Sequence, residues 1–238
     1  MIEATANPMI KFKMFVLLLF TSFLLSFVYF QKAALACEFV AVSHFNEVSP
    51  NVFIDQSLTP AQQAQLLQDI QRAVSRVAEV YGAPIATPRI IASEDARYKT
   101  LGFNPTGMQT SGFFRECVFI GPKGLNTDVI AHELVHAEVR FRTNLWVEIT
   151  QLPAWFIEGT GIQVDYREPF LQENIVVSSE DIAHIKSVFY LSDFPNTSVK
   201  YYQASLQAVK PMNPKYLYEG LQRINNGEPF TTVFKDIN

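Results

Sequence analysis

The feature that most constrains this chain is a run of seventeen uncharged residues, mostly apolar, from Met14 to Phe30. That length lies at the lower limit for a helix that spans a bilayer and slightly above the usual core of a signal peptide. Lys11 and Lys13 precede the run, and a basic flank at the extreme N-terminus is typical of an export segment rather than a buried core helix. We therefore expect residues 1–36 to be a signal peptide or a membrane anchor outside the folded domain.

Three outcomes are open for this leader. Ala34 and Ala36 form an A-x-A pattern, which favours cleavage by a signal peptidase after Ala36. Retention of the run as an anchor is the second outcome. The third is lipid attachment at Cys37, although Lys32 and Ala34 fit a lipoprotein signal poorly. Each outcome places residues 37–238 outside the cytoplasm, in a secreted, periplasmic or membrane-anchored protein.

The chain has two cysteines, Cys37 and Cys117. Compartments outside the cytoplasm are oxidising, so a disulfide between them is one expectation. Lipid attachment at Cys37 would instead leave Cys117 as an ordinary buried thiol. The sequence leaves both alternatives open.

Composition and charge limit the kinds of protein that residues 37–238 can form. Hydrophobic residues make up 48% and charged residues 18%, which argues against disorder. The net charge is −4 for the whole chain and −6 for residues 37–238, because residues 1–36 carry +2. A domain this acidic, without a run of Lys or Arg, lacks the positive surface that binds phosphates. Nucleic acid is therefore excluded as an expected partner.

Local patterns predict one α+β domain over residues 37–238. Thr59 and Gln62 form a capping box at the start of a long amphipathic helix, which Gly82 ends. The predicted elements are strands at 52–55, 89–92 and 112–120, a helix at 60–81 and a loop at 101–112. Since later segments are mostly helical, we expect a small N-terminal sheet-bearing lobe and a helical C-terminal lobe.

The residues that carry chemistry begin at His132. His132, Glu133 and His136 form the pattern H-E-x-x-H in a predicted helix with Thr127 as its N-cap. Residues four apart lie on the same helix face, so both imidazoles can bind one divalent ion, most naturally zinc. Glu133 points about 100° away, where it suits proton transfer from water better than metal ligation. The alternative, a solvated polar face, fits poorly because apolar residues surround the pair.

Glu158 is the candidate third ligand. It lies in a second predicted helix, opened by Pro153, among bulky apolar residues, where an unpaired carboxylate is costly. Gly159 and Gly161 are poor helix formers and indicate close approach of another element. Two alternatives stay open for Glu158: a salt bridge with an arginine of the H-E-x-x-H helix, or a position at a solvated helix end. The arginines in question are Arg140 and Arg142.

The two segments together resemble the gluzincin metallopeptidases, and more narrowly the compact peptidase MA-like group. The likeness is carried by His132-Glu133-Leu134-Val135-His136 and by the stretch from Leu152 to Gly161, where the family has Ala at the last position. It continues with Tyr201-Tyr202-Gln203 and Gly227-Glu228-Pro229-Phe230, so it spans about residues 113–235. The resemblance implies a zincin-like fold whose H-E-x-x-H helix carries the active site.

It further implies that His132, His136 and Glu158 bind Zn²⁺ and that Glu133 is the general base. A tyrosine of the Y-x-Q segment would donate to the oxyanion, and the spacing slightly favours Tyr201 over Tyr202. Some gluzincins orient an imidazole with an Asp four residues after the ligand Glu, where this chain has Ile162. The partner would then be a backbone carbonyl, a water or an aspartate, for which the candidates are Asp128 and Asp165.

Two functions compete on these grounds. The first is a zinc-dependent peptidase that cleaves a peptide or protein substrate, with the strand at 112–120 as the upper lip of its cleft by resemblance. The second is a catalytically inactive zincin-fold binding protein, exported or membrane-anchored. His184 follows two acidic residues and is interpreted as part of a solvated helix rather than of the site. Substrate specificity and oligomeric state are not predicted by the sequence.

Overall fold

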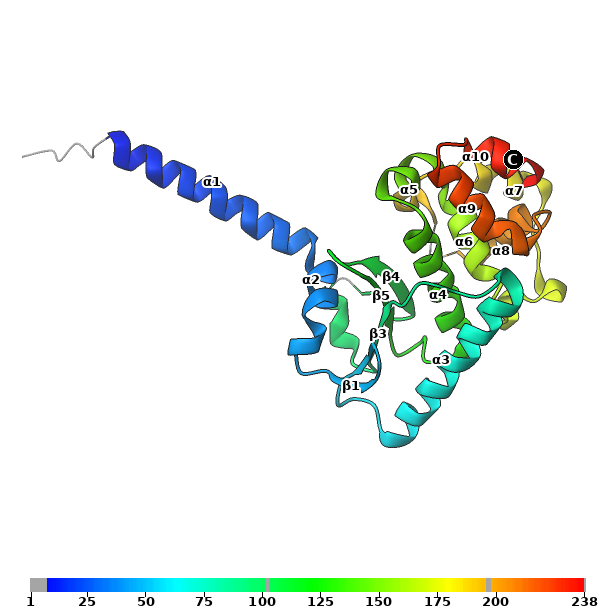
Figure 1. The fold of residues 1–238 in the computed structure, drawn as a ribbon, viewed down its shortest axis with the longest axis horizontal. Coiled ribbons are helices and arrows are strands. Elements are labelled where there is room, and N and C mark those ends of the chain that lie inside the picture. Colours follow the sequence, from blue (N-terminus) through cyan, green and yellow to red (C-terminus); the bar gives the residue numbers. More distant parts are fainter. Residues whose placement is uncertain (1–7, 102, 196–197, 238) are drawn as a thin grey trace, which may run out of the picture.

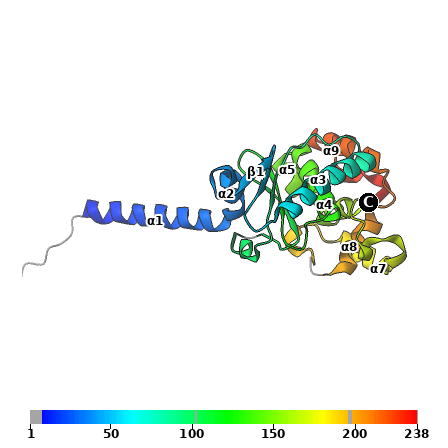
Figure 2. The ribbon, with the colours of Figure 1, turned by 90° about the horizontal axis from the view of Figure 1, so that it is seen from below.

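A computed structural model describes residues 8–101, 103–195 and 198–237 (Figure 1). It has a mixed α/β architecture with one small sheet and many helices. A long N-terminal helix projects from the body of the protein, and the sheet and the C-terminal helices form the body (Figures 1 and 2). The structure confirms the prediction of a mixed helix-and-sheet protein with a sheet-bearing N-terminal part and a helical C-terminal part.

Helix α1 (Pro8–Phe30) contains the apolar run. Its segment Phe12–Phe30 is long and apolar enough to cross a membrane, and none of the most apolar window is buried. Helix α2 (Lys32–Phe39) follows directly and packs on the body, with Ala34 and Cys37 buried. The predicted cleavage point after Ala36 thus falls inside a packed helix, and cleavage there stays a prediction. Residues 1–7 of the predicted leader lie outside the described part of the chain.

Within the described residues, five strands form one mixed sheet in the order β1-β2-β3-β5-β4. The pairs β2–β3 and β3–β5 are parallel, whereas β1 and β4 pair antiparallel at the two edges. The strands are β1 (Asn46–Ser49), β2 (Val52–Ile54), β3 (Arg89–Ala92), β4 (Gly107–Ser111) and β5 (Glu116–Ile120).

The predicted strands at 52–55 and 89–92 are confirmed, but the prediction around residue 112 is wrong in its bounds. The third predicted strand starts only at Glu116, and residues 112–115 form the turn of a hairpin. Its partner, β4, occupies 107–111, which was predicted as loop. Gly, Asn, Thr and Pro in this stretch weaken any local strand signal, so the pairing with β5 decides its conformation.

Helix α3 (Pro60–Tyr81) begins and ends as predicted. The Thr59 side chain accepts from the Gln62 backbone N–H, and the Gln62 side chain accepts from the Thr59 N–H, which completes the capping box. At the other end, Gly82 adopts φ +109°, a conformation that residues with a Cβ rarely take. The helix buries Leu66, Ala73 and Val77 in the core.

Helix α4 (Thr127–Arg142) lies between the sheet and the other helices, with contacts to β4, β5, α3 and α6. Its N-cap is Asn126, whose side chain accepts from the Val129 N–H at 3.0 Å, so the prediction of Thr127 was one residue off. Thr127 instead donates its hydroxyl to buried Asp69 of α3. The N-terminal end of α4 is therefore held by its own cap and by α3.

The helical part follows α4. Its helices are α5 (Leu145–Gln151), α6 (Ala154–Ile162), α7 (Ser179–Lys186), α8 (Val199–Val209), α9 (Leu217–Asn225) and α10 (Phe230–Val233). Short 3₁₀ helices occur at Val40–Val42, Ala96–Leu101, Glu168–Phe170, Gln172–Asn174, Leu191–Asp193, Pro214–Tyr216 and Lys235–Ile237. Helix α6 packs between α4 and α8, with aromatic side chains at its core. This packing brings the second motif segment against the H-E-x-x-H helix.

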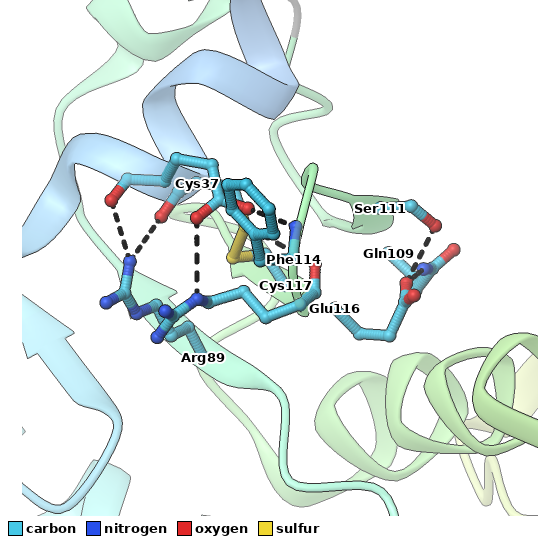
Figure 3. Close-up of a disulfide and its surroundings, with 9 residues drawn as sticks. Cys37, Arg89, Gln109, Ser111, Phe114, Glu116 and Cys117 are labelled. Carbon is cyan, nitrogen blue, oxygen red and sulfur yellow. Dashed lines mark hydrogen bonds and ion pairs between the residues drawn. A yellow bond between two sulfur atoms is a disulfide. The ribbon is translucent and has the colours of Figure 1, made fainter.

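Cys37 of α2 and Cys117 of β5 form a disulfide, shown in Figure 3. The bond confirms one of the two alternatives for these cysteines and leaves no thiol at Cys37 for a lipid. Arg89 of β3 adds to the joint, because its guanidinium donates to the backbone oxygens of Cys37 and Glu38, both at 2.9 Å. Helix α2 is thus fastened to the sheet by a covalent bond and by hydrogen bonds.

Removal of this cross-link by Cys37→Ser together with Cys117→Ser is expected to lower the free energy of unfolding by about 4.5 kcal/mol. The reason is that the bond closes a loop over a sequence separation of 80 residues, which restricts the unfolded chain. Urea unfolding followed by tryptophan emission measures the change. Wild-type protein in reductant serves as the control and should match the double variant. Equal midpoints for oxidised wild type and double variant would contradict the prediction.

Candidate metal centre

Helices α4 and α6 bring three side chains of the H-E-x-x-H…E pattern together. His132 and His136 lie one turn apart on α4, and Glu158 faces them from α6. The Glu158 Oε2 atom lies 3.4 Å from His132 Nε2 and 3.9 Å from His136 Nε2. Among the described residues this is the group of His, Cys, Asp or Glu that could hold a metal ion, with its ligand atoms all within 4.8 Å.

The alternative partners for Glu158 are engaged elsewhere. Arg140 binds Glu148 at 2.9 Å, and Arg142 binds Glu138 at 2.7 Å. Glu158 is only 6% exposed, so it is not a solvated helix end either. Both alternatives left open by the sequence are therefore excluded, and the two imidazoles are the charged or polar partners of this carboxylate.

The protonation of two of the three side chains, His136 and Glu158, suits a cation. Burial lowers the pKa of His136 to about 4, so this imidazole is neutral near pH 7. Burial opposes ionisation of Glu158, but His136 and His132 outweigh it and lower the pKa of the carboxyl group. Burial likewise opposes the charge of His132, yet Glu158 and Glu133 raise its pKa. Because a metal would compete with that proton, binding at this group is expected to release it.

The space around the two Nε2 atoms also fits a bound ion. A Cβ at Gly161 would lie 2.8 Å from His132 Nε2 and 2.8 Å from His136 Nε2, so the absent side chain leaves this position free. His136 Nε2 is buried and has no hydrogen-bond partner among the described residues, as expected of an atom that binds a metal. The group offers two imidazole nitrogens and one carboxylate oxygen, with free space between them. This arrangement matches a metal site with three protein ligands.

The second predicted glycine has a different role. A Cβ at Gly159 would lie 2.5 Å from the backbone oxygen of Ser205 in α8, so α6 and α8 approach closely there. The close approach indicated by the sequence is thus confirmed. It brings α8, and with it the Y-x-Q segment, against the helix that carries Glu158.

A carboxylate lies 3.9 Å from the Nδ1 atom of each ring, which is farther than a direct hydrogen bond. His132 Nδ1 has no hydrogen-bond partner among the described residues. Asp165, 1% exposed, has its Oδ2 atom 3.9 Å from His132 Nδ1, and Arg167 holds this carboxylate. Asp128 is not the partner: it binds Arg76 at 2.5 Å and accepts from the Tyr166 N–H. Of the candidates named from the sequence, Asp165 is therefore the one near His132.

Glu133 lies beside the metal-binding group without joining it. Its Oε2 atom accepts from the Gln109 backbone N–H at 2.7 Å and lies 3.9 Å from His136 Nδ1. Burial raises the pKa of Glu133 to about 7, and the neighbouring Glu158 works in the same direction. A carboxyl group with this pKa can accept and return a proton near neutral pH.

One cavity of about 290 Å³ opens onto this centre. His132, Glu133, Arg167 and Tyr202 contribute to its wall. Burial raises the pKa of Tyr202, and Glu158 and Glu133 add to the effect, so the hydroxyl keeps its proton and can donate it in a hydrogen bond.

The sequence favoured Tyr201, but the structure places this side chain elsewhere. Its ring packs against His184 of α7, with centroids 5.6 Å apart, and it does not line the cavity. His184 itself is exposed and outside the metal-binding group, as predicted. Gln203 fastens the chain before α7, because its side-chain amide donates to the Pro169 and Asn174 carbonyls.

Two residues that contribute to the site, Gln109 and Arg167, were not predicted from the sequence motifs. Gln109 acts through its backbone and lies in a stretch predicted as loop, so no signal marked it. Arg167 holds Asp165 and lines the cavity, and a lone arginine after the second motif has no distinguishing local pattern.

Comparisons with protein-family models, curated proteins and solved structures found no match to this chain. The part of the gluzincin resemblance that the structure supports is the spacing of His132 and His136 and their contact with Glu158. What the site can do therefore follows from its own geometry and donor atoms.

The ligand set makes a direct prediction for metal binding. His136→Ala and Glu158→Gln are each expected to weaken binding of Zn²⁺ at least about 100-fold, since loss of a ligand should exceed the 10–100-fold cost of losing a ligand's outer partner. Glu148→Gln is the matched control, because this carboxylate binds Arg140 and lies outside the group. Calorimetric titration of the purified proteins with Zn²⁺ measures the effect. Retention of tight binding by both ligand variants would reject the ligand set.

Proposed function

We propose that this protein is a zinc-dependent metallopeptidase, an enzyme that hydrolyses peptide bonds, with a zincin-like fold. The observation that carries the proposal is the position of Glu133. This buried carboxyl group, with its pKa raised to about 7, shares one cavity wall with His132 and lies outside the metal-binding group. A metal site with a purely structural role does not require a buried carboxyl group beside the ligands.

Zinc is the ion that the donor set fits best. Two imidazole nitrogens and one carboxylate oxygen leave a position open for water or substrate. A zinc ion held by His132, His136 and Glu158 would polarise a carbonyl and lower the pKa of water.

Glu133 moves the proton in this proposal. It takes a proton from the attacking water and delivers it to the nitrogen of the leaving group. The Gln109 N–H donates to one carboxylate oxygen at 2.7 Å, which holds the group in a fixed orientation. Its pKa near 7 suits both steps, because the group is neither too weak a base nor too weak an acid.

Tyr202, rather than Tyr201, is our candidate for the oxyanion donor. Its side chain lines the cavity beside His132 and Glu133, and its hydroxyl is protonated at neutral pH. A preorganised donor in a partly buried site stabilises the charge that develops on the carbonyl oxygen.

The edge of the sheet supports a peptide as substrate. Strand β4 is the last strand in the sheet order, and Gly107 at its start lines the cavity. An extended chain can add to such an edge through backbone hydrogen bonds. The apolar helix α1 and the disulfide support a location outside the cytoplasm.

Glu133→Gln tests the proposal. The variant is expected to keep about one zinc ion per chain and to lose cleavage of a mixed-peptide library, because an amide cannot accept the proton. Elemental analysis and mass spectrometry of the digests are the measurements. The Glu148→Gln protein serves as the active control. Equal cleavage by wild type and Glu133→Gln rejects the mechanism, and zinc binding without any cleavage by wild type favours the inactive binding protein.

The two tyrosines can be told apart by removing one hydroxyl at a time. Tyr202→Phe is expected to lower kcat about 10²-fold, the usual effect of losing one oxyanion donor. Tyr201→Phe should leave kcat nearly unchanged, since this ring packs against His184. Steady-state kinetics on the best peptide from the library provide the numbers. A larger loss for Tyr201→Phe would return the role to the tyrosine favoured by the sequence.

A further inference from the structure

We propose that the body of this protein rests on a lipid bilayer through a second contact beside α1. The contact, here called the bilayer-facing surface, consists of Phe113 and Phe114 in the β4–β5 turn and of Leu145, Trp146 and Ile149 on α5. The partner is the membrane that α1 is long enough to cross. This inference does not depend on the proposed peptidase activity.

The β4–β5 turn lies at the level where the apolar helix ends. The rings of Phe27 and Phe113 are stacked with centroids 6.0 Å apart. Phe27 precedes the last residue of the candidate span, Phe30, by three residues, or about 4.5 Å along a helix. If α1 crosses a bilayer, Phe113 is therefore held at the boundary between hydrocarbon and headgroups.

The turn is held there by several bonds to α2 (Figure 3). The Phe114 N–H donates to Glu38 Oε1 at 2.8 Å, and Arg115 Nε lies 3.4 Å from Glu38 Oε2. The disulfide joins the two segments a few residues further on. A Cβ at Gly112 would lie 2.5 Å from Glu38 Oε1, so the glycine permits this close approach. The position of the turn relative to the start of the body is thus fixed.

The two aromatic rings of this turn are exposed on the described part of the body. Phe114 is 88% exposed and Phe113 is close to half exposed. Exposed aromatic side chains in water forgo the free energy of burial, about 25 cal/mol for each Å² of apolar surface. At the boundary between headgroups and acyl chains, exposed Phe side chains of a membrane-associated protein can bury their apolar surface.

Helix α5 carries the second part of the surface. Val147 is buried against the body, while Leu145, Trp146 and Ile149 are exposed, with Trp146 at 72%. Its N-cap Asn144 is bound to Asn225, so the helix is fixed to α9. Among the labelled helices of the C-terminal part, α5 lies nearest to α1 in both views (Figures 1 and 2). Tryptophan is enriched at membrane interfaces, which fits an exposed Trp146 on this helix.

The native tryptophans make the test direct. The chain has two, and Trp155 is only 3% exposed whereas Trp146 is 72% exposed. Full-length protein is reconstituted into phosphatidylcholine–phosphatidylglycerol vesicles, with and without bromine on the acyl chains near the headgroups. We expect loss of most of the Trp146 emission in brominated vesicles. In Trp146→Phe, the remaining emission from Trp155 should be the same in both vesicles.

Two further variants in the Trp146→Phe background map the surface. Phe114→Trp is expected to restore quenching by brominated lipid. Tyr166→Trp is the matched control: Tyr166 is 52% exposed, and its ring packs on Arg76 near the C-terminal end of α3. That end of α3 lies away from α1 in both views (Figures 1 and 2), so the new tryptophan should not be quenched. Unquenched emission from wild type, or quenching at only one of the two tested positions, overturns the single surface. Trp146 that is shielded from acrylamide but not quenched by brominated lipid would show a protein partner or a second copy instead, which also overturns it.

Discussion

The contact between α4 and α6 at Glu158 is the interaction on which the site depends. A carboxylate that is 6% exposed among apolar side chains is costly unless another group compensates its charge. The two imidazoles of α4 supply that compensation, and a cation between them would supply more. The contact in turn requires that α6 come close to α4, which the missing side chain at Gly161 permits. The packing of α6 against α4 therefore also brings the charge of Glu158 to its polar partners.

Strand β4 links the site to the proposed bilayer-facing surface. Strand β4 donates the Gln109 N–H to Glu133 and ends at Ser111, directly before the turn with Phe113. Gln109 and Phe113 are four positions apart in the chain, a length of at most about 14 Å. A peptidase centre and a bilayer contact at these positions would lie close together.

Much of the local structure could be predicted because its causes are local. The capping box of Thr59 and Gln62 and the end at Gly82 involve groups within one helical turn, so α3 was predicted with correct bounds. Strand β4, which was predicted as a loop, shows where prediction from local sequence fails. Its residues have weak strand preference, and hydrogen bonds to β5 decide their conformation. The N-cap error at Thr127 has the same origin, since buried Asp69 of another helix binds that hydroxyl.

The sequence by itself determined that His132 and His136 share one helix face, because 3.6 residues per turn places residues four apart in line. It also determined that Glu158 needs a partner, since burial of a lone carboxylate is unfavourable. Only the tertiary structure decided which tyrosine of the neighbouring pair reaches the cavity and which aspartate stands behind His132. Those choices depend on the rotation and approach of α8 and of the segment after α6. Helix packing sets both through contacts between residues far apart in the chain, and no local pattern encodes them.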